Sequence, residues 1–175
     1  MSRKLIESLR GDLAALEKIG AISKVTMRQF DAICPPPVRE FTAADIKRLR
    51  ERLKWVEQVG ARIDERMMGD PKALQKFLGE RIIALQLFNG GIFVSDPDGL
   101  VLADVSRGGG RVGVRFRDHG AVDTALAEGR AVMGPVIVGP VLKVPALAIA
   151  APIRDAGGRV IGVMAGAVNL VEDSF

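Results

Sequence analysis

The sequence contains no tyrosine, one tryptophan, one histidine and one cysteine among its 175 residues. Because Cys34 is the single cysteine, no intrachain disulfide can form, and the chain is not a small scaffold held together by cysteine bridges. The lone histidine, His119, excludes a metal site built on two histidines, and it is too remote from Cys34 in sequence to suggest a nucleophile pair. No catalytic constellation is visible, so the sequence predicts a non-enzymatic protein without cofactor or metal.

Long hydrophobic runs are also missing. No stretch of 18 apolar residues exists, so no membrane-spanning helix is expected. The first four residues are not followed by an apolar segment, because Glu7, Arg10 and Asp12 interrupt the stretch, and a secretory signal peptide is not indicated. The expected location of the chain as written is therefore the cytoplasm.

The composition is typical of a folded globular protein, with 48% hydrophobic and 26% charged residues. The formal net charge of +4 is unevenly placed, because residues 1–50 carry ten Lys and Arg against six Asp and Glu, whereas residues 51–175 carry fifteen of each. A basic N-terminal segment suits an acidic protein partner, but an ordinary solvated surface is the favoured explanation of so small an excess. Nucleic-acid binding is not expected.

The first 69 residues are predicted to be helical on both sides of a proline-rich connector. Apolar residues at three- and four-residue spacing predict an amphipathic helix over residues 2–19. Three consecutive prolines, Pro35–Pro37, predict an extended connector. A second apolar stripe predicts one long helix over residues 43–68, which forms a homodimer seam, packs on its own sheet, or does both on opposite sides of the stripe. This stripe consists of Ile46, Leu49, Leu53, Val56, Val59, Ile63 and Met67.

From residue 70 onward the pattern changes to strands and tight turns. Residues 71–79 and 119–129 are predicted as short helices, with Asp70 capping the first. Five strands are predicted, at residues 91–96, 100–104, 131–138, 144–153 and 159–168. The glycine-rich stretch 107–111 lacks the pattern of a phosphate-binding loop and is read as a connecting loop. The sequence thus predicts an α+β fold with an antiparallel sheet, divided into a helical appendage (1–41), a long helix (42–69) and a sheet domain (70–175).

Three segments in the second half carry a family resemblance: LFNGGIFVSDPDGLVLADV (87–105), GVRFRDHGAVDTALAEGRAVMGPVIVG (113–139) and APIRDAGGRVIGVMAGAVNL (151–170). These segments contain a strand, a D-x-D-G turn and a second strand in that order, and residues 52–172 resemble the Cache sensor domains of bacterial diguanylate cyclases and chemoreceptors. The resemblance implies a PAS-like five-stranded antiparallel sheet with a ligand pocket. It further implies a small-molecule sensing module of a bacterial signal-transduction protein, a domain that is usually extracytoplasmic in this family.

A second resemblance concerns the N-terminal part. Residues 27–53, MRQFDAICPPPVREFTAADIKRLRERL, resemble the start of HigA-type helix-turn-helix antitoxins. The DNA-binding core of that family is absent here, so the alternative function is a toxin–antitoxin regulator whose N-terminal segment contacts a toxin.

Candidate ligand-binding residues lie before the helix at 119–129, which borders the ligand pocket in the Cache fold, and on the strands. Arg115 offers a planar fork for a carboxylate, and Asp118 could accept an ammonium group, although a surface ion pair at the helix N-terminus is the favoured explanation of both. The pairing would suit a small carboxylate or an amino acid, but the Cache amino-acid-binding pattern is rich in tyrosine, which this chain lacks, and that absence counts against an amino acid. The expected pocket residues are Phe93, Arg115, Phe116, Asp118, Met133 and Leu147.

Overall fold

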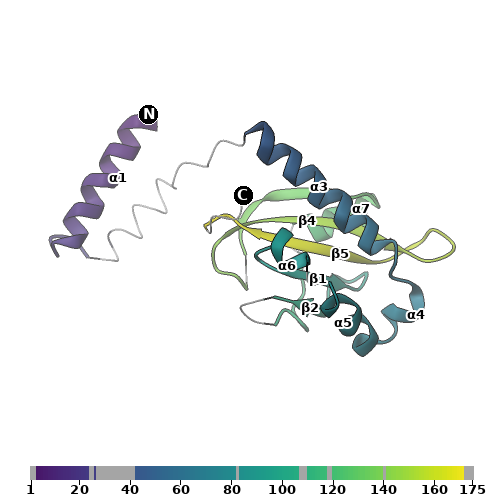
Figure 1. The fold of residues 1–175 in the computed structure, drawn as a ribbon. Helices are drawn as coiled ribbons and strands as arrows, with labels where there is room; N and C mark the ends of the chain where they lie inside the picture. The colour runs from purple at the N-terminus through teal and green to yellow at the C-terminus, as the bar shows by residue number, and fades with distance from the viewer. Residues whose placement is uncertain are drawn as a thin grey trace. The chain divides into compact units, whose positions relative to one another are not determined.

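The computed structural model describes residues 3–23, 26, 42–81, 83–106, 110–117, 120–139 and 141–171. The chain forms two compact units, Met1–Thr42 and Ala43–Phe175. The first unit contains helix α1 (Arg3–Lys18), which confirms the predicted helix at 2–19 (Figure 1). The predicted proline connector lies outside the described residues. Within the described part of the chain, no helix combines the length and the apolar character that a membrane span requires.

The second unit is built on a single antiparallel sheet of five strands, as the sequence predicts. The strand order across the sheet is β2-β1-β5-β4-β3. The first strand, β1, therefore lies beside the last strand, β5, in the middle of the sheet (Figure 1). The strands are β1 (Ile92–Ser95), β2 (Val101–Val105), β3 (Val132–Val138), β4 (Pro145–Arg154) and β5 (Val160–Asn169). All five predicted strands are confirmed to within two residues at each end.

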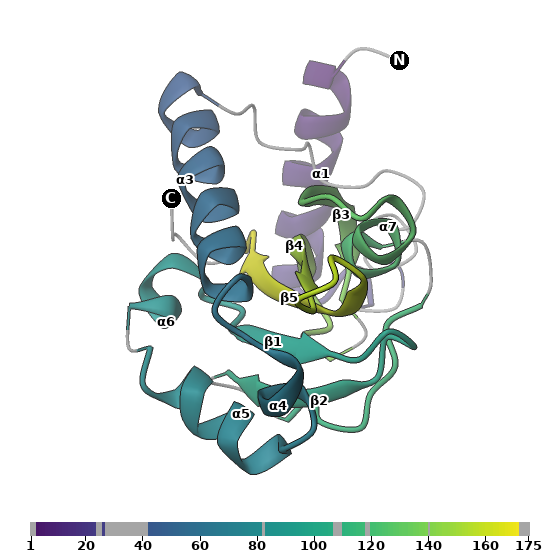
Figure 2. The ribbon, with the colours of Figure 1, turned by 90° about the vertical axis from the view of Figure 1, so that its right-hand side faces the viewer.

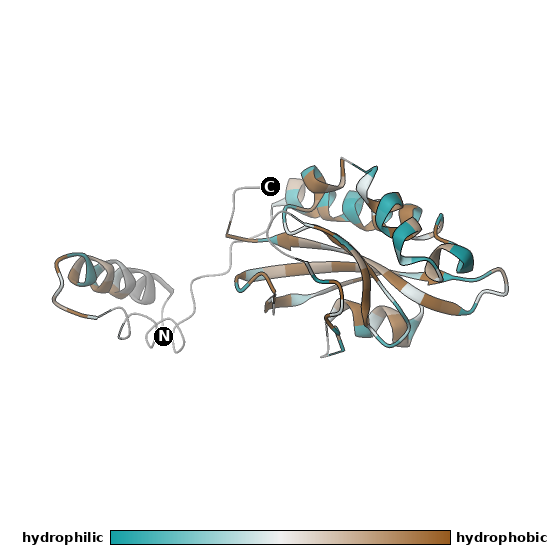
Figure 3. Ribbon diagram, turned by 90° about the horizontal axis from the view of Figure 1, so that it is seen from below, coloured by the Kyte–Doolittle hydropathy of each residue, from teal (hydrophilic) through white to brown (hydrophobic). Residues whose placement is uncertain are grey.

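Helices cover both faces of this sheet. One face packs against α3 (Ala43–Gly60), α5 (Pro71–Gly79) and α6 (Ala84–Leu87), and its buried side chains include Ile149 and Met164. The other face packs against α7 (Ala121–Glu128) and forms a smaller core. Figure 2 shows α3 and α7 on either side of β4 and β5. Figure 3 shows why both faces need cover, because the strands are hydrophobic over most of their length.

The predicted long helix ahead of the sheet is confirmed from residue 43 to Gly60, but it does not run on to residue 68. Helix α3 ends at Gly60, and a separate short helix, α4 (Glu65–Met68), begins after Asp64, whose carboxylate accepts a hydrogen bond from the Met67 backbone at 2.8 Å. The apolar stripe continues across the break because Val59 and Ile63 both pack into the core of the chain's own sheet domain. A homodimer through residues 43–68 therefore lacks its continuous helix, and dimerisation stays a prediction.

The shorter helices agree better with the sequence. Helix α5 has the predicted bounds, and Asp70 caps it by accepting hydrogen bonds from the backbones of Lys72 and Ala73 at 3.0 and 3.1 Å. Helix α7 ends before Gly129, which adopts a left-handed φ of 63° that favours glycine. Helix α6 was not predicted, because four residues are too few for a periodic pattern.

Candidate functional site

A cavity of about 390 Å³ lies on the face of the sheet that α7 covers. Its walls come from β1, from the segment before α7, from the start of α7, from the end of β3 with the loop that follows, and from β4 and β5. The described lining residues are Phe93, Arg111, Val114, Arg115, Phe116, Gly120, Ala121, Val122, Ile137, Val138, Gly139, Val141, Leu142, Ala146, Ala148 and Ala167. The space is therefore predominantly apolar, with arginine as its charged component.

The floor of the cavity is made of alanine. Ala146 and Ala148 lie on β4, and Ala148 pairs with Ala167 on β5, so the three methyl groups share one face of the sheet. Elsewhere the same strands carry valine, isoleucine and methionine. The small side chains at this end leave the volume that larger residues would fill.

Two aromatic rings form one wall. Phe93, which is buried on β1, stacks on Phe116 with ring centroids 5.1 Å apart and an interplanar angle of 25°. The guanidinium of Arg111 lies over the Phe93 ring at 5.4 Å from its centroid, within the range of a cation–π contact. The ring pair gives an apolar surface for a ligand, with a cation at its margin.

The segment that carries Arg115 is held along the outer edge of β2. The backbone of Val101 donates to the carbonyl of Val114 and accepts from the amide of Gly113, both at 2.9 Å. Arg115 pairs with Leu100 as an isolated bridge, and its Nη1 donates to the carbonyl of Asp98 at 2.9 Å. Although exposed, Arg115 is thus placed at the cavity by the backbone and by the turn between β1 and β2.

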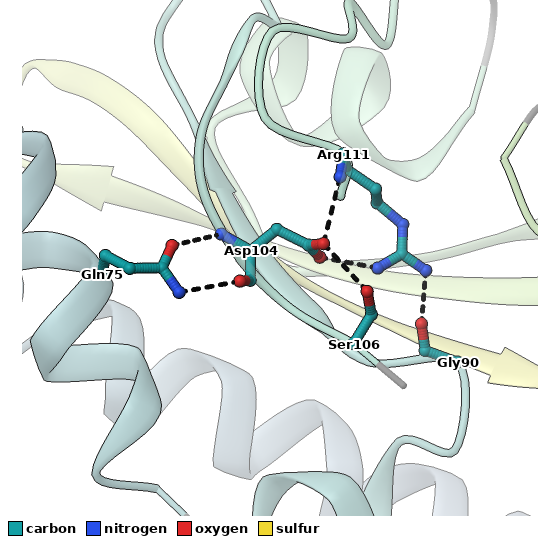
Figure 4. Close-up of polar contacts among 5 residues, drawn as sticks. All are labelled: Gln75, Gly90, Asp104, Ser106 and Arg111. Carbon is teal, nitrogen blue, oxygen red and sulfur yellow. Dashed lines mark hydrogen bonds and ion pairs between the residues drawn. The ribbon is translucent and has the colours of Figure 1, made fainter. Parts of the chain in front are cut away.

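Arg111 is held in a different way, by a buried network (Figure 4). Its Nη1 donates to Oδ1 of Asp104 at 2.7 Å, its backbone amide donates to Oδ2 at 3.0 Å, and its Nη2 donates to the carbonyl of Gly90. The side chains of Arg111 and Asp104 are only 3% and 2% exposed. Ser106 adds a further hydrogen bond to Oδ2 at 2.9 Å. Since both charges are withdrawn from water and paired, Asp104 neutralises Arg111 beside the cavity.

The structure brings three of the six expected pocket residues together. Phe93, Arg115 and Phe116 line the cavity, whereas Asp118 lies outside the described residues. Leu147 is buried on the opposite face, in the core beneath α3, and Met133 is 41% exposed and paired with Ile149 of that same face. Neighbouring residues in a strand point to opposite faces, which separates Leu147 from the cavity residues Ala146 and Ala148.

Sequence reasoning missed Arg111, the two floor alanines of β4 (Ala146 and Ala148) and the loop after β3. Arg111 belongs to a stretch that reads as a connecting loop, and its burial depends on Asp104, which reads as a turn residue. The one available signal was the concentration of alanine on β4, because alternating small residues on one side of a strand leave space beside it. Among the described residues, no group of histidine, cysteine, aspartate and glutamate could hold a metal ion.

Comparisons with known proteins agree with this architecture. The family model described as single cache domain 3 (sCache_3_2) matches residues 58–169. No curated protein matches the chain. Neither the family model nor the solved structures support the antitoxin-like interpretation of residues 27–53.

Several solved structures have the same fold. The ligand-binding domain of the Pseudomonas aeruginosa PAO1 amino acid chemoreceptor PctB, in complex with L-Arg, has a TM-score of 0.55 at 20% identity and shares 70% of this chain. The corresponding domain of the Pseudomonas aeruginosa PAO1 chemoreceptor PctC, in complex with GABA, has a TM-score of 0.57 at 22% identity, and the match covers 71% of this chain. The ligand-binding domain of the Pseudomonas fluorescens chemoreceptor CtaA, in complex with L-isoleucine, has a TM-score of 0.58 at 18% identity, and the match covers 73% of this chain. The chain spans 50%, 58% and 52% of these three domains, so it corresponds to about half of each.

Proposed function

The chain belongs to the single cache domain 3 family of ligand-binding sensor domains, and from this premise we propose that it senses a small carboxylate-bearing organic molecule for a signal-transduction protein. The observation that carries the proposal is the cavity beside α7. It is apolar, it has a volume of about 390 Å³, and the charged side chains among its described lining residues are both arginines. A cavity of this size and character is typical of small-molecule sites.

Arg115 is the proposed carboxylate-binding group. One N–H of its guanidinium is engaged with the Asp98 carbonyl, and the remaining N–H groups keep the planar fork that binds carboxylates. The stacked rings of Phe93 and Phe116 would contact the apolar part of the ligand.

The solved relatives support the same ligand chemistry. PctB, PctC and CtaA were each solved with a molecule that carries a carboxylate, namely L-Arg, GABA and L-isoleucine. Their identity to this chain is 22% or less, so their likeness concerns the fold, and the ligand of this chain is inferred from its own residues.

The test is calorimetric titration of the purified chain with a panel of acetate, propionate, hexanoate, succinate, adipate, citrate, L-alanine, L-norleucine and 4-aminobutanoate. At least one carboxylate is expected to bind, and Arg115→Gln should weaken it by about 10- to 100-fold, since a charged hydrogen bond contributes about 1.5–3 kcal/mol.

Arg117→Gln is the matched control. Arg117 lies two residues away, donates to the Pro97 carbonyl of the same turn at 3.1 Å, and lines a separate hollow beside Leu126. Its loss should leave the affinity unchanged. A panel without any binder, or an equal loss in both variants, would overturn the proposal.

A further inference from the structure

We infer that the cavity selects an apolar monocarboxylate, a molecule with one negative charge and no ammonium group. This inference rests on the proposed function, because it specifies the ligand of the same site. It follows from three properties of the described lining: how many positive charges are available, whether any side chain could accept hydrogen bonds from an ammonium, and what surrounds the rest of the ligand.

Two arginines reach the cavity, but only one of them is available to pair with a ligand carboxylate. Arg111 forms a buried ion pair with Asp104 at 2.7 Å, and its other terminal nitrogen donates to the Gly90 carbonyl. A ligand carboxylate that took Arg111 would leave the Asp104 carboxylate buried without its partner, which is strongly unfavourable. Arg111 therefore contributes a guanidinium over the Phe93 ring whose charge Asp104 already neutralises.

Arg115 supplies the single positive charge. Its recorded hydrogen bond goes to the backbone carbonyl of Asp98, a neutral acceptor, and none of the ion pairs seen among the described residues involves it. A second carboxylate on the ligand would thus enter an apolar space without a cation to pair with.

An ammonium group finds no side-chain acceptor in the described lining. Apart from the two arginines, every described lining residue is glycine, alanine, valine, leucine, isoleucine or phenylalanine, and none carries a carboxylate, hydroxyl or amide. Burying an ammonium group there, close to Arg115, is unfavourable through both desolvation and like-charge repulsion.

The remaining surface suits a hydrocarbon. The stacked pair Phe93 and Phe116 lines the cavity together with the alanine floor and with Leu142 from the loop after β3. The chain of a fatty acid or the ring of an arylalkanoate would bury its carbon atoms against these groups and keep its carboxylate at Arg115.

Three six-carbon acids test this selectivity, because adipate and L-norleucine each differ from hexanoate by one added charged group. Hexanoate carries one carboxylate, adipate adds a second at the far end, and L-norleucine adds an ammonium beside the first. Calorimetric titration of the full chain at neutral pH is expected to show hexanoate binding at least roughly tenfold more tightly than either relative.

Each contrary result has a separate meaning. Tighter binding of adipate would show that Arg111 is available as a second cation. Tighter binding of norleucine would show an ammonium acceptor, for which Asp118 is the sequence candidate. Either result, or binding of a diacid, citrate or an amino acid when acetate, propionate and hexanoate all fail to bind, overturns the inference and leaves the proposed function standing. If no member of the panel binds, both the inference and the proposed function are overturned.

Discussion

The side-chain amide of Gln75 on α5 takes the place of a neighbouring strand beside Asp104 on β2. Its Nε2 donates to the Asp104 carbonyl at 2.9 Å, and its Oε1 accepts from the Asp104 amide at 3.1 Å. Because β2 is an edge strand, these backbone groups would otherwise lack a partner in the sheet. The amide thus ties α5 to the residue whose carboxylate holds Arg111 (Figure 4).

Gln75→Ala is expected to destabilise the sheet domain. It removes both hydrogen bonds and leaves the Asp104 backbone with weaker partners, which costs about 1–3 kcal/mol. Urea unfolding followed by circular dichroism measures the loss. Gln58→Ala, at an exposed glutamine on α3, is the control and should change the unfolding free energy by less than about 0.5 kcal/mol. Equal stability of the two variants would contradict a strand-like role for Gln75.

Removing one member of the buried pair Asp104–Arg111 should lower the unfolding free energy much more than replacing both members together. Asp104→Ala leaves a buried guanidinium without its carboxylate, and we expect a loss of about 3–5 kcal/mol. The double variant Asp104→Leu/Arg111→Met replaces the charges by apolar groups, so it should be more stable than Asp104→Ala. A double-mutant cycle in urea that adds the single variants Asp104→Leu and Arg111→Met measures the coupling, and strictly additive losses would refute it.

The strands were predictable because their turns have distinctive chemistry. Gly99 lies at the turn between β1 and β2 with a φ of 76°, and Asp96 caps the same turn by accepting from the Leu100 amide at 2.9 Å. Such signals are local, so they can be recognised without knowledge of the rest of the fold.

The cavity was less predictable because it depends on contacts between distant segments. Leu147 and Ala148 are both apolar, and only the packing of α3 and α7 decides which of them faces open space. The same limit explains the helix at 43–68. The apolar spacing continues to Met67, but α3 ends at Gly60, which packs so closely on the sheet that an added Cβ would lie 3.3 Å from the Met164 Cβ.

Phe88 packs its ring directly on Gly166 of β5, and this contact allows no added methyl group. A Cβ at Gly166 would overlap the Cδ1 and Cε1 atoms of Phe88, which is fully buried. Gly166→Ala is therefore expected to lower the unfolding free energy by about 1–3 kcal/mol in urea titrations. Combining it with Phe88→Leu should cost less than the sum of the two single changes, since the smaller side chain vacates the space.

Gly79→Ala is the matched control for that change. Gly79 is the last residue of α5, and nothing lies within 4 Å of an added Cβ. The methyl group should leave stability unchanged or raise it by about 0.5–1 kcal/mol, because alanine favours a helix over glycine. Similar losses at both glycines would contradict the packing argument.

The turn between β4 and β5 should respond to acid through Asp155. The backbone amide of Arg159, at 2.9 Å, and the Arg159 guanidinium, at 3.0 Å, lower the pKa of Asp155 below its ordinary value. A carboxyl whose pKa is lower in the folded state stabilises the fold at neutral pH, and this contribution is lost as the pH falls through the folded pKa.

Carbon-detected NMR titration measures this pKa directly. Arg159→Gln should raise the pKa of Asp155 only in part, because the largest cause is the backbone amide, which the substitution retains. Complete return of the pKa to its ordinary value would show that the guanidinium dominates, contrary to this expectation.

Ala148→Leu should close the cavity without unfolding the protein. The Ala148 methyl group is only partly buried and faces the open volume between β4 and the Phe93–Phe116 wall, so a larger side chain fills space that no protein atom occupies. The melting temperature should hold or rise, whereas binding of the tightest carboxylate in the panel should fall by at least roughly tenfold. Ala127→Leu adds the same atoms at an exposed position of α7 and should leave binding intact. If Ala148→Leu binds the carboxylate as the unaltered chain does, the ligand lies somewhere other than this cavity, and the role inferred for Arg115 is lost with it.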